Sequence, residues 1–556
     1  MNRHSGDSRS FWATTARIAK RTPLAEDRSA DVCIIGAGIA GLTTALELQR
    51  SGQSVIVLDD GPIAGGETER TTAHLSSVLG DRYDELERLH GADGARLAAA
   101  SHTAAIARIE AIASQFGNRC GFERLDGYLF VPPGADPSVL DRELAAARRA
   151  GLARVERVPR APLATFDTGA CLKFPEQGQI HPLRYVAGLA AALKKAGGEI
   201  FTGTHVSAIE DGAPVRVEAA GGTVRARAVV VATNSPVNDL FAIHTKQAAY
   251  RTYVIGAQIP AGSVARALYW DTCEEPESQT ASRSPYHYVR LARIPGSPGT
   301  ELLIVGGGDH KTGQAHDAEE RFSRLETWTR ERFPVRSIAH RWSGQIMESV
   351  DSLAFIGRNP GNRNVYVATG DSGNGMTHGT IAGILLSALI QGRDHDWAKL
   401  YDPSRVTFGA AVAFTEENVN VAAQYADWVT PGDRESARGL RRGQGAILRR
   451  GVQKIAAYRD GAGVLHERSA VCVHLGCLVG WNSFEKTWDC PCHGSRYDQL
   501  GRVVNGPANS NLPAVEAGEP KTPTMARSTF DLGGDTAKPA AGLHPRKRKS
   551  RAENLE

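Results

Sequence analysis

Two short segments near the C-terminal end each combine a cysteine with a histidine. One is Cys472-Val473-His474, and the other, after fifteen intervening residues, is Cys490-Pro491-Cys492-His493. Thiolates and imidazoles bind transition metals, and in one kind of [2Fe–2S] cluster two thiolates hold one iron while two imidazoles hold the other. Two loops that each supply one cysteine and one histidine satisfy this requirement. The sequence therefore predicts Cys472, His474, Cys490 and His493 as cluster ligands.

A zinc site is the alternative, because Zn²⁺ binds the same types of side chain. Zinc fingers group like ligands, as C-x-x-C followed by H-x-x-x-H, whereas each segment here is mixed. The spacing therefore favours an iron–sulfur cluster over zinc. The other cysteines are scattered singly, a distribution typical of buried thiols: Cys33, Cys120, Cys171 and Cys273.

The segments VCVHLGC (471–477) and CPCHGSRYDQLGRVVNGPA (490–508) resemble the Rieske domains of the cytochrome bc type. The resemblance implies a disulfide between Cys477 and Cys492 that ties the two ligand loops together. It also implies hydrogen bonds from Ser495 and Tyr497 to the cluster, and such bonds stabilise the reduced cluster and raise its potential. The extra cysteine pair argues against a Rieske oxygenase, which also requires a mononuclear iron held by two histidines and a carboxylate.

A glycine-rich turn near the N-terminus is the second candidate site. Gly36-Ala37-Gly38-Ile39-Ala40-Gly41 follows the apolar residues 32–35. Glycines in such a turn let the backbone approach a pyrophosphate, whose charge then lies at the N-terminus of the next helix. Asp59 ends the next apolar run, 23 residues after Gly36, where a carboxylate can accept the ribose hydroxyls. Residues 31–60 thus predict a strand, a helix and a second strand that bind a dinucleotide.

NAD and FAD both use this design, and two features favour FAD. The unit opens a long α/β region, and a late glycine-rich segment, 368–380, leads from a strand into an apolar helix. A helix N-terminus there would stabilise negative charge on a reduced flavin. The glycines at 306–308 follow a strand but lead into Asp309-His310-Lys311 and no apolar helix. We therefore expect no separate nicotinamide domain, and an organic substrate that reduces the flavin directly.

GAGIAG, the strand end at Asp59, VVVATNS (229–235) and VYVATGDSGNGMTHGT (365–380) resemble the D-amino-acid-oxidase-like flavoproteins, which oxidise C–N bonds of amino acids and amines. The resemblance covers roughly residues 30–402 and departs from the family at Asn234, where a glycine is usual. We find no confident arginine for a substrate carboxylate. The resemblance implies that FAD contacts Gly36, Gly38, Ile39, Ala40, Gly41, Asp59, Thr72, His74, Val206, Thr233, Gly370, Gly373, Asn374, Gly375, Met376 and Thr377.

His74 and a group of residues in the middle third are the remaining candidates. Thr71-Thr72-Ala73-His74 resembles the segment that carries a histidyl-linked flavin in some amine dehydrogenases, so His74 is either a covalent anchor or an unlinked histidine near the isoalloxazine. The middle third, where the superfamily builds its substrate-facing sheet, offers weak catalytic candidates that could equally be core residues: Tyr253, Tyr286, Tyr288, Arg290 and Trp342. Because the substrate gives hydride to flavin, the protein mainly positions the donor and excludes water.

These signals predict a Rossmann-like α/β FAD-binding domain with an inserted substrate-facing β-sheet, followed by a small all-β Rieske domain. We expect a flexible N-terminal arm over 1–29, the FAD-binding oxidoreductase domain over 30–403, a connector over 404–450, the Rieske domain over 451–528 and a basic tail over 529–556.

Composition excludes several other classes of function. The net charge of +4, from 65 basic and 61 acidic side chains, creates no field that would attract nucleic acid. No apolar run approaches the roughly 18 residues of a transmembrane helix, and we expect a cytoplasmic protein.

The sequence thus predicts an FAD-dependent dehydrogenase that oxidises an amine or amino acid and passes electrons through the Rieske cluster to an unidentified one-electron acceptor protein or quinone. An oxidase that uses oxygen, with a structural or regulatory cluster, is one alternative. A non-catalytic redox sensor is the other.

Overall fold

The computed structural model describes residues 5–80, 82–238, 243–272 and 286–515. The basic tail, the last part of the expected Rieske domain and Cys273 lie outside the described residues. Cys33, Cys120 and Cys171 are buried free thiols, as their scattered positions predict.

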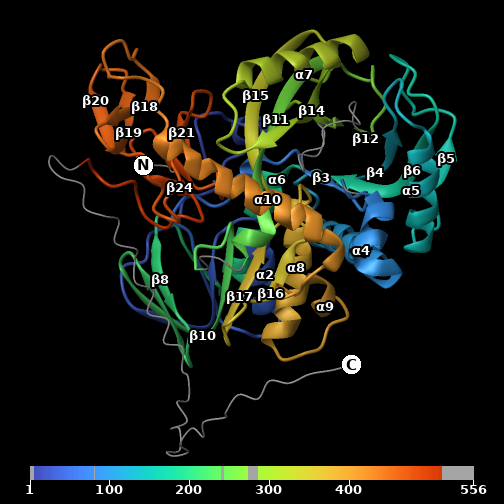
Figure 1. Cartoon of the computed structure of the whole chain (residues 1–556). Helices are drawn as coiled ribbons and strands as arrows, with labels where there is room; N and C mark the ends of the chain where they lie inside the picture. Colours follow the sequence, from blue (N-terminus) through green and yellow to red (C-terminus); the bar gives the residue numbers. More distant parts are fainter. Residues whose placement is uncertain (1–4, 81, 239–242, 273–285, 516–556) are drawn as a thin grey trace, which may run out of the picture. The chain divides into compact units, whose positions relative to one another are not determined.

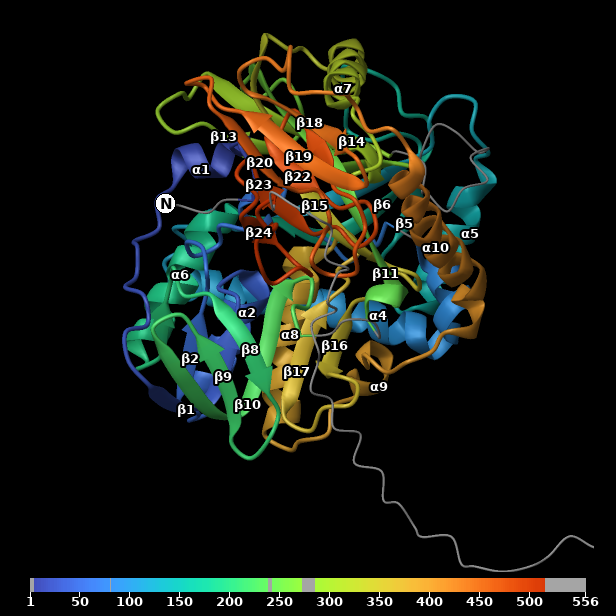
Figure 2. The ribbon, with the colours of Figure 1, turned by 60° about the vertical axis from the view of Figure 1, so that its left-hand side comes forward.

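A mainly parallel sheet forms the first layer of the N-terminal part (Figures 1 and 2). Its central strand β1 (Arg28–Ile35) pairs in parallel with β2 (Val55–Leu58) and β10 (Gly222–Asn234). Both faces of these strands are covered, which explains their continuous apolar runs. The sheet is completed by β7 (Glu199–Phe201), β17 (Val365–Thr369) and β16 (Phe355–Arg358), with β8 (Val206–Glu210) and β9 (Val215–Ala219) attached to β10.

Two helices pack against each other beside this sheet, α2 (Ile39–Arg50) and α8 (Gly375–Ile390). Their close approach depends on glycine: a Cβ added to Gly379 would lie 2.9 Å from Ile39 Cγ2. A side chain at Gly41 would collide with the carbonyl oxygen of Gly36. Gly36 itself has a φ of +107°, a backbone conformation that requires glycine. The N-terminus of α8 thereby lies next to the glycine-rich turn that begins α2.

A second, larger sheet has the order β15-β11-β14-β13-β12-β4-β6-β3, with β5 on β6. Its long central strands β11 (Gln247–Pro260) and β14 (Thr300–Lys311) are antiparallel. The other strands are β3 (His74–Leu75), β4 (Glu123–Phe130), β5 (Glu156–Val158), β6 (Cys171–Gln179), β12 (Leu268–Asp271), β13 (Tyr288–Arg293) and β15 (Ser337–Ser349). The remaining helices of this part are α3 (Glu67–Arg70), α4 (Arg82–Gln115), α5 (Ser138–Arg149), α6 (Pro182–Lys195), α7 (Ala318–Arg332) and α9 (Ala398–Tyr401).

Two small antiparallel sheets form the C-terminal part. The first has β18 (Gln444–Arg450), β19 (Gln453–Arg459) and β20 (Leu465–Ser469), and the second has β21 (Gly480–Asn482), β22 (Thr487–Asp489), β23 (Arg496–Asp498) and β24 (Val503–Asn505). One cysteine–histidine segment lies between β20 and β21, and the other between β22 and β23. The predicted fold, an α/β domain with a large inserted sheet followed by a small all-β domain, is confirmed.

The N-terminal residues differ from the expected flexible arm. A short helix, α1 (Phe11–Thr15), buries Phe11 and Trp12, which are 2% and 1% exposed. The indole of Trp12 donates a hydrogen bond of 2.7 Å to Thr71 O. Burial of two large aromatic side chains repays the entropy of ordering this segment.

The expected connector contains helix α10 (Ala411–Gln424), which has no buried residue along its length. Short 3₁₀ turns precede and follow it, at Phe408–Ala410 (η2) and Tyr425–Val429 (η3). None of the helices within the described ranges is both long and apolar enough to cross a lipid bilayer.

Candidate functional site

The four predicted cluster ligands lie together in the small C-terminal domain. The imidazole rings of His474 and His493 are 5.0 Å apart, and Cys472 and Cys490 are 1% and 2% exposed. Hydrogen bonding, chiefly with Cys490 and also with Tyr497, lowers the pKa of Cys472 and favours the thiolate that binds metal. The structure thus brings the two thiols together and the two imidazoles together, from two loops of one small domain.

The surroundings of these side chains fit a [2Fe–2S] cluster. Nδ1 of His493 is buried and has no hydrogen-bond partner among the residues described. Burial lowers the pKa of His493 to about 4, so its imidazole is neutral and can bind a metal. A buried imidazole nitrogen without a partner is costly unless it binds a ligand.

The predicted disulfide between Cys477 and Cys492 is present. The sulfur atoms of both residues lie within 4.8 Å of Cys490 Sγ, so the crosslink is adjacent to a ligand. The hydroxyl of Tyr497 lies 3.2 Å from Cys472 Sγ, while Ser495 Oγ accepts a hydrogen bond from Ala508 N. The hydrogen bonds that both residues would give to the cluster stay a prediction.

A cavity of about 1340 Å³ lies between the two large sheets. Most of the predicted FAD contacts line it: Gly36, Gly38, Ile39, Ala40, Asp59, Thr72, His74, Val206, Thr233, Gly373, Asn374, Gly375 and Met376. Gly41, Gly370 and Thr377 do not. Gly41 serves the contact between helix and strand, and the hydroxyl of Thr377 donates to Asn374 O.

Asp59 lies where the turns that follow β1 and β2 meet. Its carboxylate accepts hydrogen bonds of 2.7 Å from Ala37 N and Gly61 N. Burial, opposed by these bonds, raises the pKa of Asp59 to about 6. The carboxylate is therefore held rigidly at the edge of the cavity, as a ribose-binding group requires.

His74 lies in the cavity wall between two aromatic side chains. Its ring centroid is 5.8 Å from those of Trp270 and Tyr288, and Nδ1 is 3.1 Å from Thr72 Oγ1. Nε2 is buried and has no hydrogen-bond partner within the described ranges. Burial lowers the pKa of His74 to about 3. A neutral imidazole with one unused nitrogen fits a position beside a bound flavin, and the covalent link stays a prediction.

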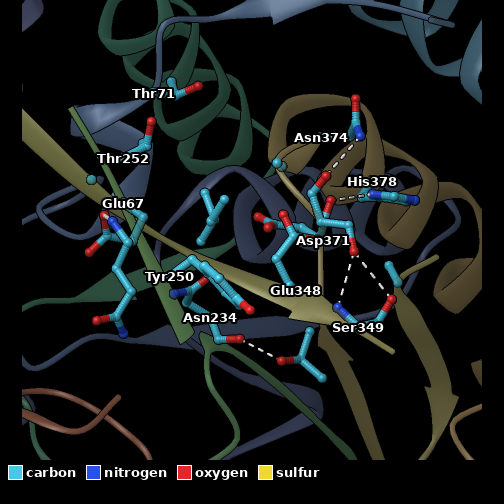
Figure 3. Close-up of a pocket in the computed structure, with 18 of the residues that line it drawn as sticks. Glu67, Thr71, Asn234, Tyr250, Thr252, Glu348, Ser349, Asp371, Asn374 and His378 are labelled. Atoms are coloured by element: carbon cyan, nitrogen blue, oxygen red, sulfur yellow. Dashed lines mark hydrogen bonds between the residues drawn. The ribbon is translucent and has the colours of Figure 1, made fainter. Parts of the chain in front are cut away.

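The late glycine-rich segment forms another side of the cavity. In Figure 3, Asp371, Asn374 and His378 gather at the start of α8, and Thr252 lies on the opposite side of the view. His378 Nδ1 lies 2.9 Å from Asp371 O, and Ser372 Oγ accepts a hydrogen bond from Ser349 N. The segment is thereby held in place by α8 and β15.

The departure at Asn234 has a structural explanation. Its φ of +67° lies in the left-handed region, which asparagine tolerates better than most residues other than glycine. Its carbonyl accepts a 2.6 Å hydrogen bond from Thr369 Oγ1, which ties the ends of β10 and β17 together.

The structure separates the catalytic candidates into two groups. Tyr286 and Tyr288 line the cavity, and the hydroxyl of Tyr288 lies 2.5 Å from Thr252 Oγ1. Tyr253 instead contacts His310 in a second apolar core, and Trp342 donates to Arg70 O. Arg290 donates to the carbonyl oxygens of Thr72 and Ala73 and also lies outside the cavity lining. These three side chains hold the wall in place.

Sequence reasoning missed several lining residues of the large sheet: Tyr250, Thr252, Trp270, Asp309 and Gln345. Strand β11 is almost wholly buried, and β14 is buried through its middle, so their pattern shows no simple alternation of polar and apolar residues. A polar residue inside an otherwise apolar strand, such as Thr252, was the sequence signal that could have indicated a cavity-lining position.

The cavity and the cluster loops share a wall. Gln345 of β15 lines the cavity, and its side-chain amide donates a hydrogen bond of 3.0 Å to Gly494 O, next to His493. His244 of η1 (His244–Lys246) lies with its ring 5.0 Å from that of His474. The polar segment after β14 reaches the same loop, because Gly313 lies directly against Pro491.

Comparison with known proteins supports both sites. Residues 31–389 match the family described as FAD dependent oxidoreductase, and residues 435–516 match the Rieske [2Fe-2S] domain. The chain is 29% identical over 514 residues to the Rieske 2Fe-2S iron-sulfur protein YhfW of Bacillus subtilis, covering 91% of this chain and 97% of that protein.

A further relative and a solved structure each match about two thirds of the chain. Gamma-glutamylputrescine oxidoreductase of Escherichia coli is 27% identical over 397 residues, covering 69% of this chain and 89% of that protein. The crystal structure of glycine oxidase from Geobacillus kaustophilus superimposes with a TM-score of 0.55 at 18% identity, covering 68% of this chain and 99% of the other, and supports the fold alone. The two predicted cofactors, FAD and a Rieske [2Fe–2S] cluster, are thereby confirmed. The chain belongs to the family of FAD-dependent oxidoreductases and carries a Rieske [2Fe–2S] domain after its flavin-binding part.

Proposed function

We propose that this enzyme is a dehydrogenase that oxidises a C–N bond of an amine or amino acid and passes the electrons through the Rieske cluster to an external one-electron acceptor. FAD supplies the two-electron oxidation of substrate, and a [2Fe–2S] cluster exchanges single electrons. The acceptor is a protein or a quinone.

The shared wall is the observation that carries this proposal. A single side chain, Gln345, borders the cavity and also binds the cluster loop at Gly494. The cavity lining further includes Asn505 and Ala508 of the Rieske domain. A cluster that served only as a distant structural support would not need contact with the flavin site.

The chain's own residues prepare the site in two ways. The glycine-rich turn and Asp59 bind the dinucleotide portion, and the start of α8 lines the cavity with the N-terminus of a helix, which stabilises negative charge. Trp270, Tyr286 and Tyr288 form an apolar surface that excludes water from the substrate. Hydride leaves a neutral amine, whose nitrogen lone pair forms the C=N bond, so a substrate bound as an ammonium must first give up a proton.

Rapid mixing under anaerobic conditions tests the proposal. We expect amines or amino acids to bleach the flavin without oxygen. In a second assay in air, ferricenium, a one-electron oxidant, should support steady turnover with little peroxide. Cys490→Ser should spare bleaching by substrate and abolish transfer to ferricenium, whereas Cys120→Ser, another buried thiol, should leave both steps unchanged.

Each alternative makes a different prediction for the assay in air and for anaerobic bleaching. Peroxide formed at the rate of substrate oxidation, with no effect of Cys490→Ser, would favour an oxygen-using oxidase with a structural cluster. Failure of every amine and amino acid to bleach the flavin would favour a redox sensor.

A further inference from the structure

Three carboxylates of the large sheet line the cavity, those of Asp271, Asp309 and Glu348. Asp271 pairs with His287, whereas Asp309 lies among aromatic side chains. Asp309, the first polar residue after the glycines of β14, lines the cavity together with Trp270, Tyr286 and Tyr288. Tyr288 lies over Gly306, where any side chain would collide with its ring. The glycine run thus makes room for an aromatic surface beside this carboxylate.

Asp309 has no cationic partner among the residues that the structure describes. Its Oδ1 is buried without a hydrogen-bond partner in those ranges, and the side chain of Thr252 is hydrogen-bonded to the carboxylate. Arg321 donates to the backbone oxygen of Asp309 at 3.1 Å but forms no ion pair with its carboxylate. Arg321 pairs with Asp317 at 2.7 Å, and His287 pairs with Asp271 at 2.7 Å. Burial raises the pKa of Asp309 to about 6, and a cationic ligand hydrogen-bonded to Oδ1 would stabilise its ionised form.

This position is connected to the place predicted for the flavin ring. The hydroxyl of Thr252 lies 2.5 Å from that of Tyr288, and the ring of Tyr288 is 5.8 Å from that of His74. A substrate nitrogen at Asp309 would therefore lie on the side of the cavity where His74 contributes to the wall.

The cavity offers little to bind a substrate carboxylate. Its described lining holds four arginines, and each lies within 4 Å of a carboxylate: Arg70 of Glu485, Arg88 of Glu85, and both Arg82 and Arg142 of Asp84. Arg290 donates to backbone carbonyls behind the wall. Aromatic faces, by contrast, attract ammonium groups through cation–π interactions.

We propose that Asp309 binds the nitrogen of the substrate, and that the substrate is a cationic amine without an α-carboxylate. The proposal rests on the function proposed above, since it assigns the substrate class of the same site. Asp309 is a specificity-determining residue: it accepts a charge-assisted hydrogen bond from the ammonium group, and Trp270 and Tyr288 surround the adjacent carbon atoms.

Binding of tert-butylamine tests this without turnover, because its carbon next to nitrogen has no hydrogen to transfer. Binding to the FAD-loaded enzyme is followed by the perturbation of flavin absorption. We expect saturable binding near neutral pH, where the probe is an ammonium ion, and much weaker binding of tert-butanol and of the anion pivalate. Pivalate binding more tightly than tert-butylamine would overturn the proposal.

Variants locate the binding group. Asp309→Asn should raise the Kd for tert-butylamine by about 10- to 100-fold, and Asp309→Glu should restore part of the affinity. Glu416→Gln removes an exposed carboxylate of α10 that lines the same cavity, and it should change the Kd less than twofold. An unchanged Kd in Asp309→Asn that retains FAD would overturn the assignment.

Flavin bleaching separates this inference from the proposed function. If amines bleach the flavin equally well in the native enzyme and in Asp309→Asn, the inference fails and the function stands. If tert-butylamine binds through Asp309 and no amine bleaches the flavin, the amine-binding role of Asp309 is retained and the proposed dehydrogenase function is rejected.

Discussion

Arg70 and Glu485 form an ion pair of 2.9 Å in which the side chains are 2% and 0% exposed. Arg70 ends α3 beside the flavin cavity, and Glu485 lies between β21 and β22 of the Rieske domain. Arg251 of β11 approaches the same carboxylate at 3.3 Å. Two buried cations of one domain therefore depend on one carboxylate of the other, and the two domains are joined by charge as well as by packing.

Glu485→Gln should destabilise the protein strongly. The change leaves Arg70 and Arg251 buried without their counter-charge, which costs about 3–5 kcal/mol when one partner of a buried pair is removed. Chemical unfolding followed by flavin fluorescence measures the loss. Glu467→Gln, which breaks the exposed pair with Arg450, is the matched control and should cost at most about 1 kcal/mol. A similar small loss in both variants would contradict the prediction.

Acid should weaken the same contact. Although burial opposes it, the charges of Arg70, Arg251 and Arg496 lower the pKa of Glu485 to about 2. A glutamate in the unfolded chain has a pKa of about 4.3. Because the folded-state pKa is the lower one, the stabilisation is complete above pH ~4.3 and is lost as the pH falls toward 2. The free energy of unfolding of the native protein should therefore fall over this range more steeply than that of Glu485→Gln.

Tyr497→Phe should lower the reduction potential of the cluster. It removes the hydroxyl that lies 3.2 Å from Cys472 Sγ, and with it a hydrogen bond that favours the reduced state. We expect a decrease of about 30–60 mV, or about 0.7–1.4 kcal/mol for one electron. Protein-film voltammetry measures the potential. Tyr458→Phe, whose ring stacks on His466 in the same domain, is the control and should leave the potential unchanged.

Acid precipitation decides between the two roles of His74. Its buried Nε2 can receive a covalent bond to the flavin or can contact an unlinked flavin. A covalent link predicts a yellow pellet in native protein and a colourless pellet in His74→Ala. Free FAD in the supernatant of the native protein would exclude the link and leave His74 as a neighbour of the ring.

Sites made from consecutive residues could be predicted from the sequence, because their geometry is local. The ligand loops and the turn from Gly36 to Gly41 are of this kind. The cavity wall is not: Tyr253 and Thr252 are adjacent in β11, yet Thr252 faces the cavity and Tyr253 packs in another core. A buried strand has two apolar faces, and the layer that each face contacts depends on strand order and register. The residues of one strand do not specify that order or register. The contact of Gln345 with Gly494 likewise depends on how two domains dock.

The contacts of the first residues have a consequence for how the protein is made. Arg496 donates a 3.0 Å hydrogen bond to Ser5 Oγ, and Ser8 N donates to Glu485. The beginning of the chain therefore reaches its final place only after almost the whole chain has left the ribosome. His493 is then only 6% exposed, and His244 lies against the ligand histidines. We therefore expect iron and sulfide to enter before the two domains close.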